Sequence, residues 1–296
     1  MCRKLGILPS MQPRRSQPSE TSDTMFLMKR KALTACLTAV VIVTSASAHD
    51  LFLKLDTYIL QPNSTAVVRL LNGTFQTSDG AVSRERMRDI SIIGPGSEVP
   101  QREPPAWRDE GKTTVMELRT GAPGTYVVGI STKPREIALK AADFNNYLEH
   151  DGLPDILAAR KKNNELGKDS RERYSKHVRA IFQVGDRRSD DYKALLNYPV
   201  EIIPQQNPYS LRPGQTISVL CLLEGRPLVN QFVIAGWESK DGKLPLVNTR
   251  TDEKGIARFK LSSSGKWFVK MIHMEPINEP SLNYESKWAT LTFEIK

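Results

Sequence analysis

The chain has 296 residues, of which 42 are Lys or Arg and 33 are Asp or Glu, giving a formal net charge of +9. Seven of the basic and two of the acidic residues fall within residues 1–48, so the remainder carries only about +4, spread along the chain. A charge this weak and dispersed argues against a nucleic-acid-binding protein, which needs a clustered basic surface.

Residues 25–48 have the pattern of a secretory signal peptide. A basic cluster at residues 29–31 precedes a mostly apolar run at residues 32–43, and Ala46-Ser47-Ala48 is a small-residue cleavage site. The apolar run is too short for a membrane span, which takes about 20 residues. We therefore expect export to the periplasm or cell envelope, with no stable membrane span after cleavage. Residues 1–24, which are polar and lack periodicity, are interpreted as a disordered, over-extended gene start.

Cleavage after Ala48 would make His49 the first residue of the mature protein. A free α-amine and an imidazole on one residue chelate a divalent transition metal in a single ring, which an internal histidine cannot do. Asp50 adds a carboxylate next to them, either as a ligand or as a hydrogen-bond acceptor behind the ligands. The sequence therefore predicts a metal site at the new terminus. The alternative is a frayed terminus without a metal.

Cysteine usage also depends on the leader. Cys2 and Cys36 both lie in it, so the mature chain keeps Cys221 alone and has no internal disulfide. Cys221 alternates with apolar residues in a strand predicted at residues 217–223. This pattern favours a buried, unreactive thiol over a nucleophile.

A near-repeat indicates two similar halves. Tyr58-x-Leu60-x-Pro62 and Tyr209-x-Leu211-x-Pro213 each lead into an apolar strand, and short alternating segments separated by turn residues fill both halves. We predict a mainly β protein of two tandem immunoglobulin-like antiparallel β-sandwich domains, at residues 49–198 and 199–296. Chance similarity between two β-rich stretches is the alternative.

Residues 136–184 depart from this pattern and predict a helical insertion late in the first domain. Ile137–His150 has mixed helical periodicity, and Pro154 suits the first turn of a second helix. A third helix is predicted to follow a cap at Asp169 or Ser170. The many charges of the insertion are most simply a solvated face, with partner docking as the alternative.

Several motifs, taken in order, resemble one bacterial family. They are the leader ending Ala48-His49-Asp50, residues 171–176 leading to Gln183-Val184-Gly185, residues 201–204 with Asn207-Pro208-Tyr209, and Gly265-Lys266-Trp267 running to His273-Met274. Over essentially its whole mature length the chain is similar to an exported bacterial family of undefined function, the NikM-like family, which is often described as the periplasmic, substrate-specific component of nickel or cobalt uptake. The resemblance implies nickel or cobalt as ligand and a membrane transporter component as partner.

Other soft-metal donors are few. The strand predicted at residues 267–273 ends at His273, which can lie at the rim of a sandwich and meet His49. Met274 points the other way and offers a thioether, which favours copper(I) or another soft ion. The predicted metal ligands are therefore His49, Asp50, His273 and Met274, and the predicted ion is nickel, cobalt or copper. The alternative for His273 is a hydrogen-bonded structural role.

His150 and His177 are interpreted as solvent-facing or packing residues. The sequence contains no nucleophile elbow, phosphate-binding loop or dinucleotide fingerprint, and no paired Cys or His spacing typical of structural zinc. We predict a non-enzymatic, exported protein that binds a transition metal for an envelope uptake system. The alternative is an adhesion or scaffolding module that binds protein or glycan without a metal. Trp107, Trp237 and Trp288 would then be exposed contacts, although core packing is the simpler interpretation of each.

Overall fold

The computed structural model describes residues 49–96, 106–239 and 241–296. The predicted signal peptide and gene start, residues 1–48, lie outside the described residues. Over the part that is described, no helix combines the length and the apolar character needed to cross a membrane.

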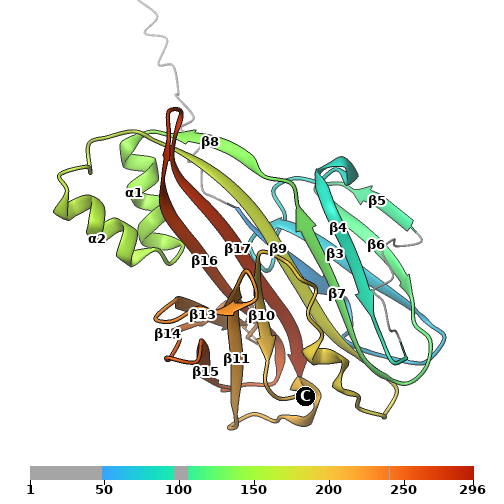
Figure 1. Cartoon of the computed structure of the whole chain (residues 1–296). Helices are drawn as coiled ribbons and strands as arrows, with labels where there is room; N and C mark the ends of the chain where they lie inside the picture. The colour runs from blue at the N-terminus through green and yellow to red at the C-terminus, as the bar shows by residue number, and fades with distance from the viewer. Residues whose placement is uncertain (1–48, 97–105, 240) are drawn as a thin grey trace, which may run out of the picture. The chain divides into compact units, whose positions relative to one another are not determined.

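The described chain is mainly β and forms three sheets (Figure 1). One four-stranded sheet has the order β1 (Asp50–Leu55), β3 (Thr65–Gly73), β6 (Thr113–Arg119) and β5 (Ala106–Glu110). The other four-stranded sheet contains β10 (Val200–Pro204), β11 (Thr216–Leu223), β12 (Arg226–Pro227) and β15 (Ile256–Lys260).

The third sheet is the largest. Its order is β14 (Leu246–Arg250), β13 (Phe232–Trp237), β16 (Gly265–Glu279), β17 (Leu282–Ile295), β9 (Ser170–Val184), β7 (Gly124–Thr132) and β4 (Met87–Ile93), and β2 (Ile59–Leu60) and β8 (Arg135–Leu139) also pair with β9. Two α-helices, α1 (Ala141–His150) and α2 (Pro154–Lys162), and three 3-10 turns, η1 (Arg84–Arg86), η2 (Asp190–Lys193) and η3 (Pro208–Ser210), complete the described elements.

The large sheet takes strands from both halves of the chain. β17 pairs antiparallel with β16 and parallel with β9, in a register that runs from Tyr284 opposite Glu172 to Thr292 opposite Ala180. The predicted class, mainly β with antiparallel sheets, is confirmed, and the β17–β9 and β2–β9 pairs are parallel exceptions. The predicted domain boundary at residues 198–199 stays a prediction.

The helical insertion is shorter than predicted. Helices α1 and α2 lie within the predicted range. The prediction of a third helix is wrong, because residues 170–184 form the 15-residue strand β9. Nearly every side chain of β9 from Ser175 onward is buried, on both faces. A strand buried on both faces loses the polar alternation by which strands are recognised, and its pairing with β7, β8 and β17 overrides local helical preference.

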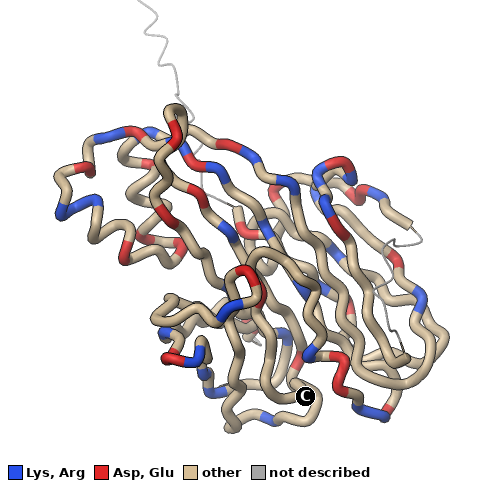
Figure 2. Tube along the Cα trace, in the orientation of Figure 1, with Lys and Arg blue, Asp and Glu red and all other residues tan. Residues whose placement is uncertain are grey.

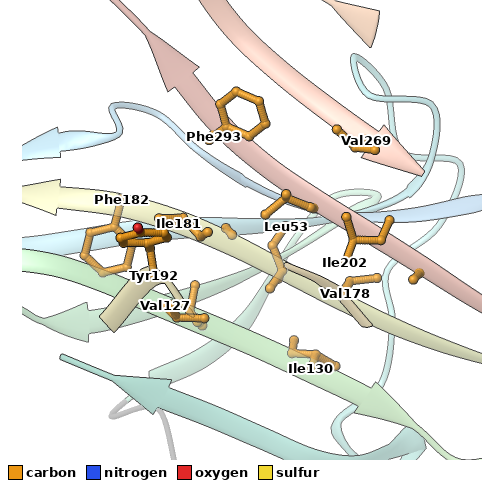
Figure 3. Close-up of a cluster of buried hydrophobic side chains, with 14 of the residues drawn as sticks. Leu53, Val127, Ile130, Val178, Ile181, Phe182, Tyr192, Ile202, Val269 and Phe293 are labelled. Atoms are coloured by element: carbon orange, nitrogen blue, oxygen red, sulfur yellow. The ribbon is translucent and has the colours of Figure 1, made fainter. Parts of the chain in front are cut away.

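The two smaller sheets cover opposite faces of the large one. On one face, the hydroxyls of Thr290 and Thr292 of β17 donate to the carbonyls of Leu51 and Leu53 in β1. On the other, Arg179 of β9 pairs with a carboxylate of β10. Apolar side chains fill both layers (Figure 3).

The cysteine prediction is confirmed. Cys221 on β11 is fully buried, and burial raises the pKa of its thiol to about 12. The thiol therefore stays protonated and unreactive at neutral pH.

Close packing above β7 gives a test of this fold. A Cβ added at Gly129 would lie 2.1 Å from Leu196 Cδ1 and 3.1 Å from the Tyr198 ring. We expect Gly129→Ala to lower the free energy of unfolding by about 1–3 kcal/mol, because overpacked cores must shift side chains or backbone. Urea unfolding measures the change. Gly80→Ala is the control, since nothing lies within 4 Å of the added atom; equal midpoints for the two variants would contradict this packing.

Candidate metal site and adjoining pocket

His49 lies at the edge of a pocket on the face of the large sheet that β1 covers. The pocket has a volume of about 200 Å³. Besides His49, its lining includes Arg86 from η1, Arg135 from β8, Glu172, Tyr174 and Lys176 from β9, and Trp288 from β17. The three β9 residues share one face because side chains alternate along a strand. We call this cavity the His49 pocket.

The imidazole of His49 faces a carboxylate that the sequence analysis missed. Its Nδ1 lies 3.1 Å from Asp79 Oδ2, and the two side chains are 40% and 50% exposed. Antiparallel pairing places Asp50 opposite Gly73, and the backbone N–H of Asp79 donates to the Asn72 carbonyl. A turn after β3 thus returns Asp79 to the start of β1. Nothing in the sequence around Asp79 signals this, because it depends on strand register.

Asp50, a predicted ligand, is instead part of a buried ion cluster. Lys270 Nζ lies 2.6 Å from Asp50 Oδ2 and 3.2 Å from Asp151 Oδ1. Burial alone would lower the pKa of Lys270, but the two carboxylates outweigh it and raise that pKa. Burial disfavours the charged form of Asp151 as well, and for a carboxyl group this raises the pKa. The carboxylate of Asp50 therefore holds β1 against β16, and we remove it from the proposed ligands.

His273 is on the other face of β16 from Lys270, because the two residues are an odd number of positions apart. Its Nδ1 lies 3.4 Å from Gln231 Oε1, its Nε2 is buried with no hydrogen-bond partner in the described chain, and burial lowers its pKa. The arrangement therefore gives no support to a site shared by His49 and His273.

Met274 points the other way from His273, as the alternation predicted. It is 7% exposed and packs in an apolar cluster with Ile272, Trp288 and residues of α1. Among the residues described, no group of three or more His, Cys, Asp or Glu side chains is arranged to hold a metal ion. A four-ligand site of His49, Asp50, His273 and Met274 is thus not assembled.

Two ionisable groups of β9 are buried beside the pocket. Burial lowers the pKa of Lys176 to about 8, and its Nζ donates to the His49 carbonyl and lies 5.0 Å from the centroid of the Trp288 ring. Burial also raises the pKa of Glu172 to about 7, although Ser286 and Tyr147 both donate hydrogen bonds to it. Lys176 therefore fixes the backbone of His49 from inside the pocket.

The remaining histidines have structural roles. His177 lies on the opposite face of β9, with its ring nitrogens 2.9 Å from the hydroxyls of Ser131 and Ser175, and burial lowers its pKa to about 3. His150 is exposed at the end of α1, where its Nδ1 lies 2.8 Å from the Asn146 carbonyl oxygen. Trp288, considered above as an exposed contact, is only 4% exposed.

The ion cluster gives a prediction about stability. Lys270→Met leaves the carboxylates of Asp50 and Asp151 buried without a cation, so the free energy of unfolding should fall by about 3–5 kcal/mol. Urea denaturation measures it. Lys243→Met, which removes an exposed partner of Asp241, is the control and should change little. A loss as small as the control's would show that the cluster is solvated.

Glu172 gives a prediction about pH. Its folded pKa of about 7 lies above the ordinary 4.5, so ionisation opposes folding increasingly as pH rises from 4.5 through 7. Glu172→Gln should therefore stabilise the protein by up to about 3 kcal/mol above pH 7 and by much less near pH 4.5. Thermal unfolding at several pH values, with exposed Glu149→Gln as control, measures this. A pH-independent difference would contradict a raised pKa.

Comparison with known proteins supplies a family. A family model described as a domain of unknown function (DUF4198) matches residues 46–275. No protein with a curated description matches the chain.

Three similar solved structures are distant in sequence and in fold. The Escherichia coli adhesin FdeC shares 13% identity with a TM-score of 0.24, over 84% of this chain and 65% of that chain. The D0-D1 domain of intimin shares 14% identity with a TM-score of 0.19, over 81% and 96%. A two-domain fibronectin type III segment of chicken tenascin shares 10% with a TM-score of 0.20, over 84% and 99%. Scores of this size carry no argument about function.

Proposed function

This chain belongs to the family described as domain of unknown function DUF4198, and we propose that it is an exported protein that binds nickel, cobalt or copper at its mature N-terminus. The ion would be passed to an envelope uptake system, with a membrane transporter component as partner. The similarity to the NikM-like family supports this role.

The observation that carries the proposal is the spacing of His49 and Asp79. Two donor atoms that are each about 2.1 Å from one ion, with a donor–metal–donor angle of about 90°, lie about 3 Å from each other. The distance of 3.1 Å between His49 Nδ1 and Asp79 Oδ2 matches this, and both side chains are open to solvent. These two atoms can bind one ion with little movement.

Cleavage after Ala48 would add a third donor. The freed α-amine of His49 and its Nδ1 close a six-membered chelate ring on the metal, with the Asp79 carboxylate beside it. Two nitrogens and one oxygen suit copper(II), nickel(II) or cobalt(II) better than magnesium or calcium, which prefer oxygen ligands alone.

The terminus is held in place, which lowers the entropy lost when it binds an ion. Lys176 donates to the carbonyl of His49, and Lys270 pairs with the next side chain, that of Asp50. Lys176 and Arg86 also place positive charge near the bound cation and weaken its binding. Moderate affinity suits a protein that delivers its ion.

Calorimetric titration of mature protein that begins at His49 tests the proposal. We expect affinity to rise from cobalt(II) through nickel(II) to copper(II), the general order for nitrogen and oxygen donors. His49→Ala, Asp79→Asn, and a short Gly-Ser extension that keeps its own amine away from His49 should each weaken copper(II) binding by about tenfold or more, a loss of about 1.4 kcal/mol or more.

Three control variants complete this experiment. Asp143→Asn, at a half-buried residue of α1, and His150→Gln, at an exposed one, should leave copper(II) affinity unchanged, and so should His273→Ala, since His273 lies on the other face of β16. Equal, weak binding by the mature and extended forms would refute the chelating terminus. The adhesion or scaffolding module would then be the remaining proposal.

A further inference from the structure

Arg86 is a buried cation with two unpaired guanidinium nitrogens. It ends η1 and is 9% exposed, and its Nε and Nη2 have no hydrogen-bond partner among the described residues. Its guanidinium carbon lies 5.7 Å from the centroid of the Tyr174 ring, which compensates only in part for lost hydration. Nε and Nη2 form the edge of the guanidinium group that binds a carboxylate through two parallel hydrogen bonds.

Positive charge predominates in the His49 pocket. Along β8 and the part of β9 that pairs with it, basic and acidic residues are interspersed (Figure 2), and Glu136 lies opposite Arg173. The lining of the pocket, by contrast, has Arg86, Arg135 and Lys176 against the single acid Glu172. A site with this surplus attracts an anion, and it does so more strongly because the cations are partly removed from water.

The walls of the pocket are suited to more than a bare inorganic ion. Tyr174 and Trp288 present aromatic surfaces, and Ile137 and Leu139 of β8 add aliphatic ones. The volume of about 200 Å³ equals that of about seven waters at roughly 30 Å³ each, enough for a short-chain or single-ring acid. Apolar walls with a few fixed polar groups are typical of small-molecule sites.

From these observations we propose that the His49 pocket binds a small organic carboxylate, with the acid group on Arg86 and the apolar body against Tyr174 and the aliphatic side chains of β8. This goes beyond the proposed function and does not rest on it, because none of the residues that contact the acid in this way is a proposed metal ligand. A carboxylate would supply the acceptors that Arg86 lacks.

The test uses mature protein that begins at His49, in buffer passed over a chelating resin so that no metal is present. Titration calorimetry with benzoate should show saturable binding in the millimolar range or tighter. Benzamide, which has the same shape without the charge, should bind at least about tenfold more weakly, since charge-assisted hydrogen bonds are about twice as strong as neutral ones. Phosphate should also bind more weakly, because it leaves the apolar walls uncovered.

Arginine variants locate the binding site. Arg86→Met should weaken benzoate binding by about tenfold or more, with far-UV circular dichroism unchanged, because a buried pair with the ligand is lost. Arg135→Met serves as a second variant in case Arg86→Met does not fold, because Arg135 is exposed and its loss should not affect folding. The Arg135→Met change should weaken benzoate binding severalfold. Arg88→Met, two residues along the chain from Arg86 and also exposed, is the matched control.

Three results would overturn the inference. They are equal affinity for benzoate and benzamide, phosphate binding as tight as benzoate, and benzoate binding that survives both Arg86→Met and Arg135→Met. Metal binding is tested independently, by comparing copper(II) titrations of the mature protein and its His49→Ala variant. A protein that binds benzoate but no copper would therefore refute the proposed function and leave this inference standing.

Discussion

The ammonium of Lys270, buried between the carboxylates of Asp50 and Asp151, is the constraint on which the arrangement of this face depends. The three groups come from the large sheet, the first strand and the end of α1. None of them can be buried alone, because an unpaired ion loses several kcal/mol of hydration. The chain must therefore bring β1 and α1 to the same place on β16. That requirement positions His49, and through it Asp79 and the mouth of the pocket.

Strand β9 gives the two faces of the large sheet different chemistry. Glu172, Tyr174 and Lys176 project into the His49 pocket, while His177 and Arg179 project toward β10 and its neighbours. On the second face Arg179 Nη2 meets Glu201 and both nitrogens of His177 meet serine hydroxyls, while Arg179 Nη1 has no hydrogen-bond partner among the described residues. The first face keeps a lysine and an arginine whose partners are incomplete. The unpaired edge of Arg86 differs from Arg179 Nη1 in that it lines a pocket, where a ligand can enter.

Local pattern predicted much of the fold and little of the site. Turn residues, alternation and helical periodicity were enough for the β class, for α1 and α2, and for the placement of His273 and Met274 on opposite faces of β16. They failed for β9, whose burial on both faces removes alternation, and for Asp79, which meets His49 only through the register of β1 and β3. Asp50 was identified as important for the wrong reason. Its partner Lys270 lies 220 residues away, and local pattern carries no information about such pairs.

The parallel pairing of β17 with β9 has a consequence for how the molecule is made. Residues 282–295 follow every other strand of the large sheet in sequence, yet they fill the middle of that sheet, between β16 and β9. Until they arrive, the long edges of both neighbours stay open and the apolar layers on either side cannot close. Contacts this distant in sequence form slowly. Closure of the large sheet is therefore a late step in folding, since it waits for β17.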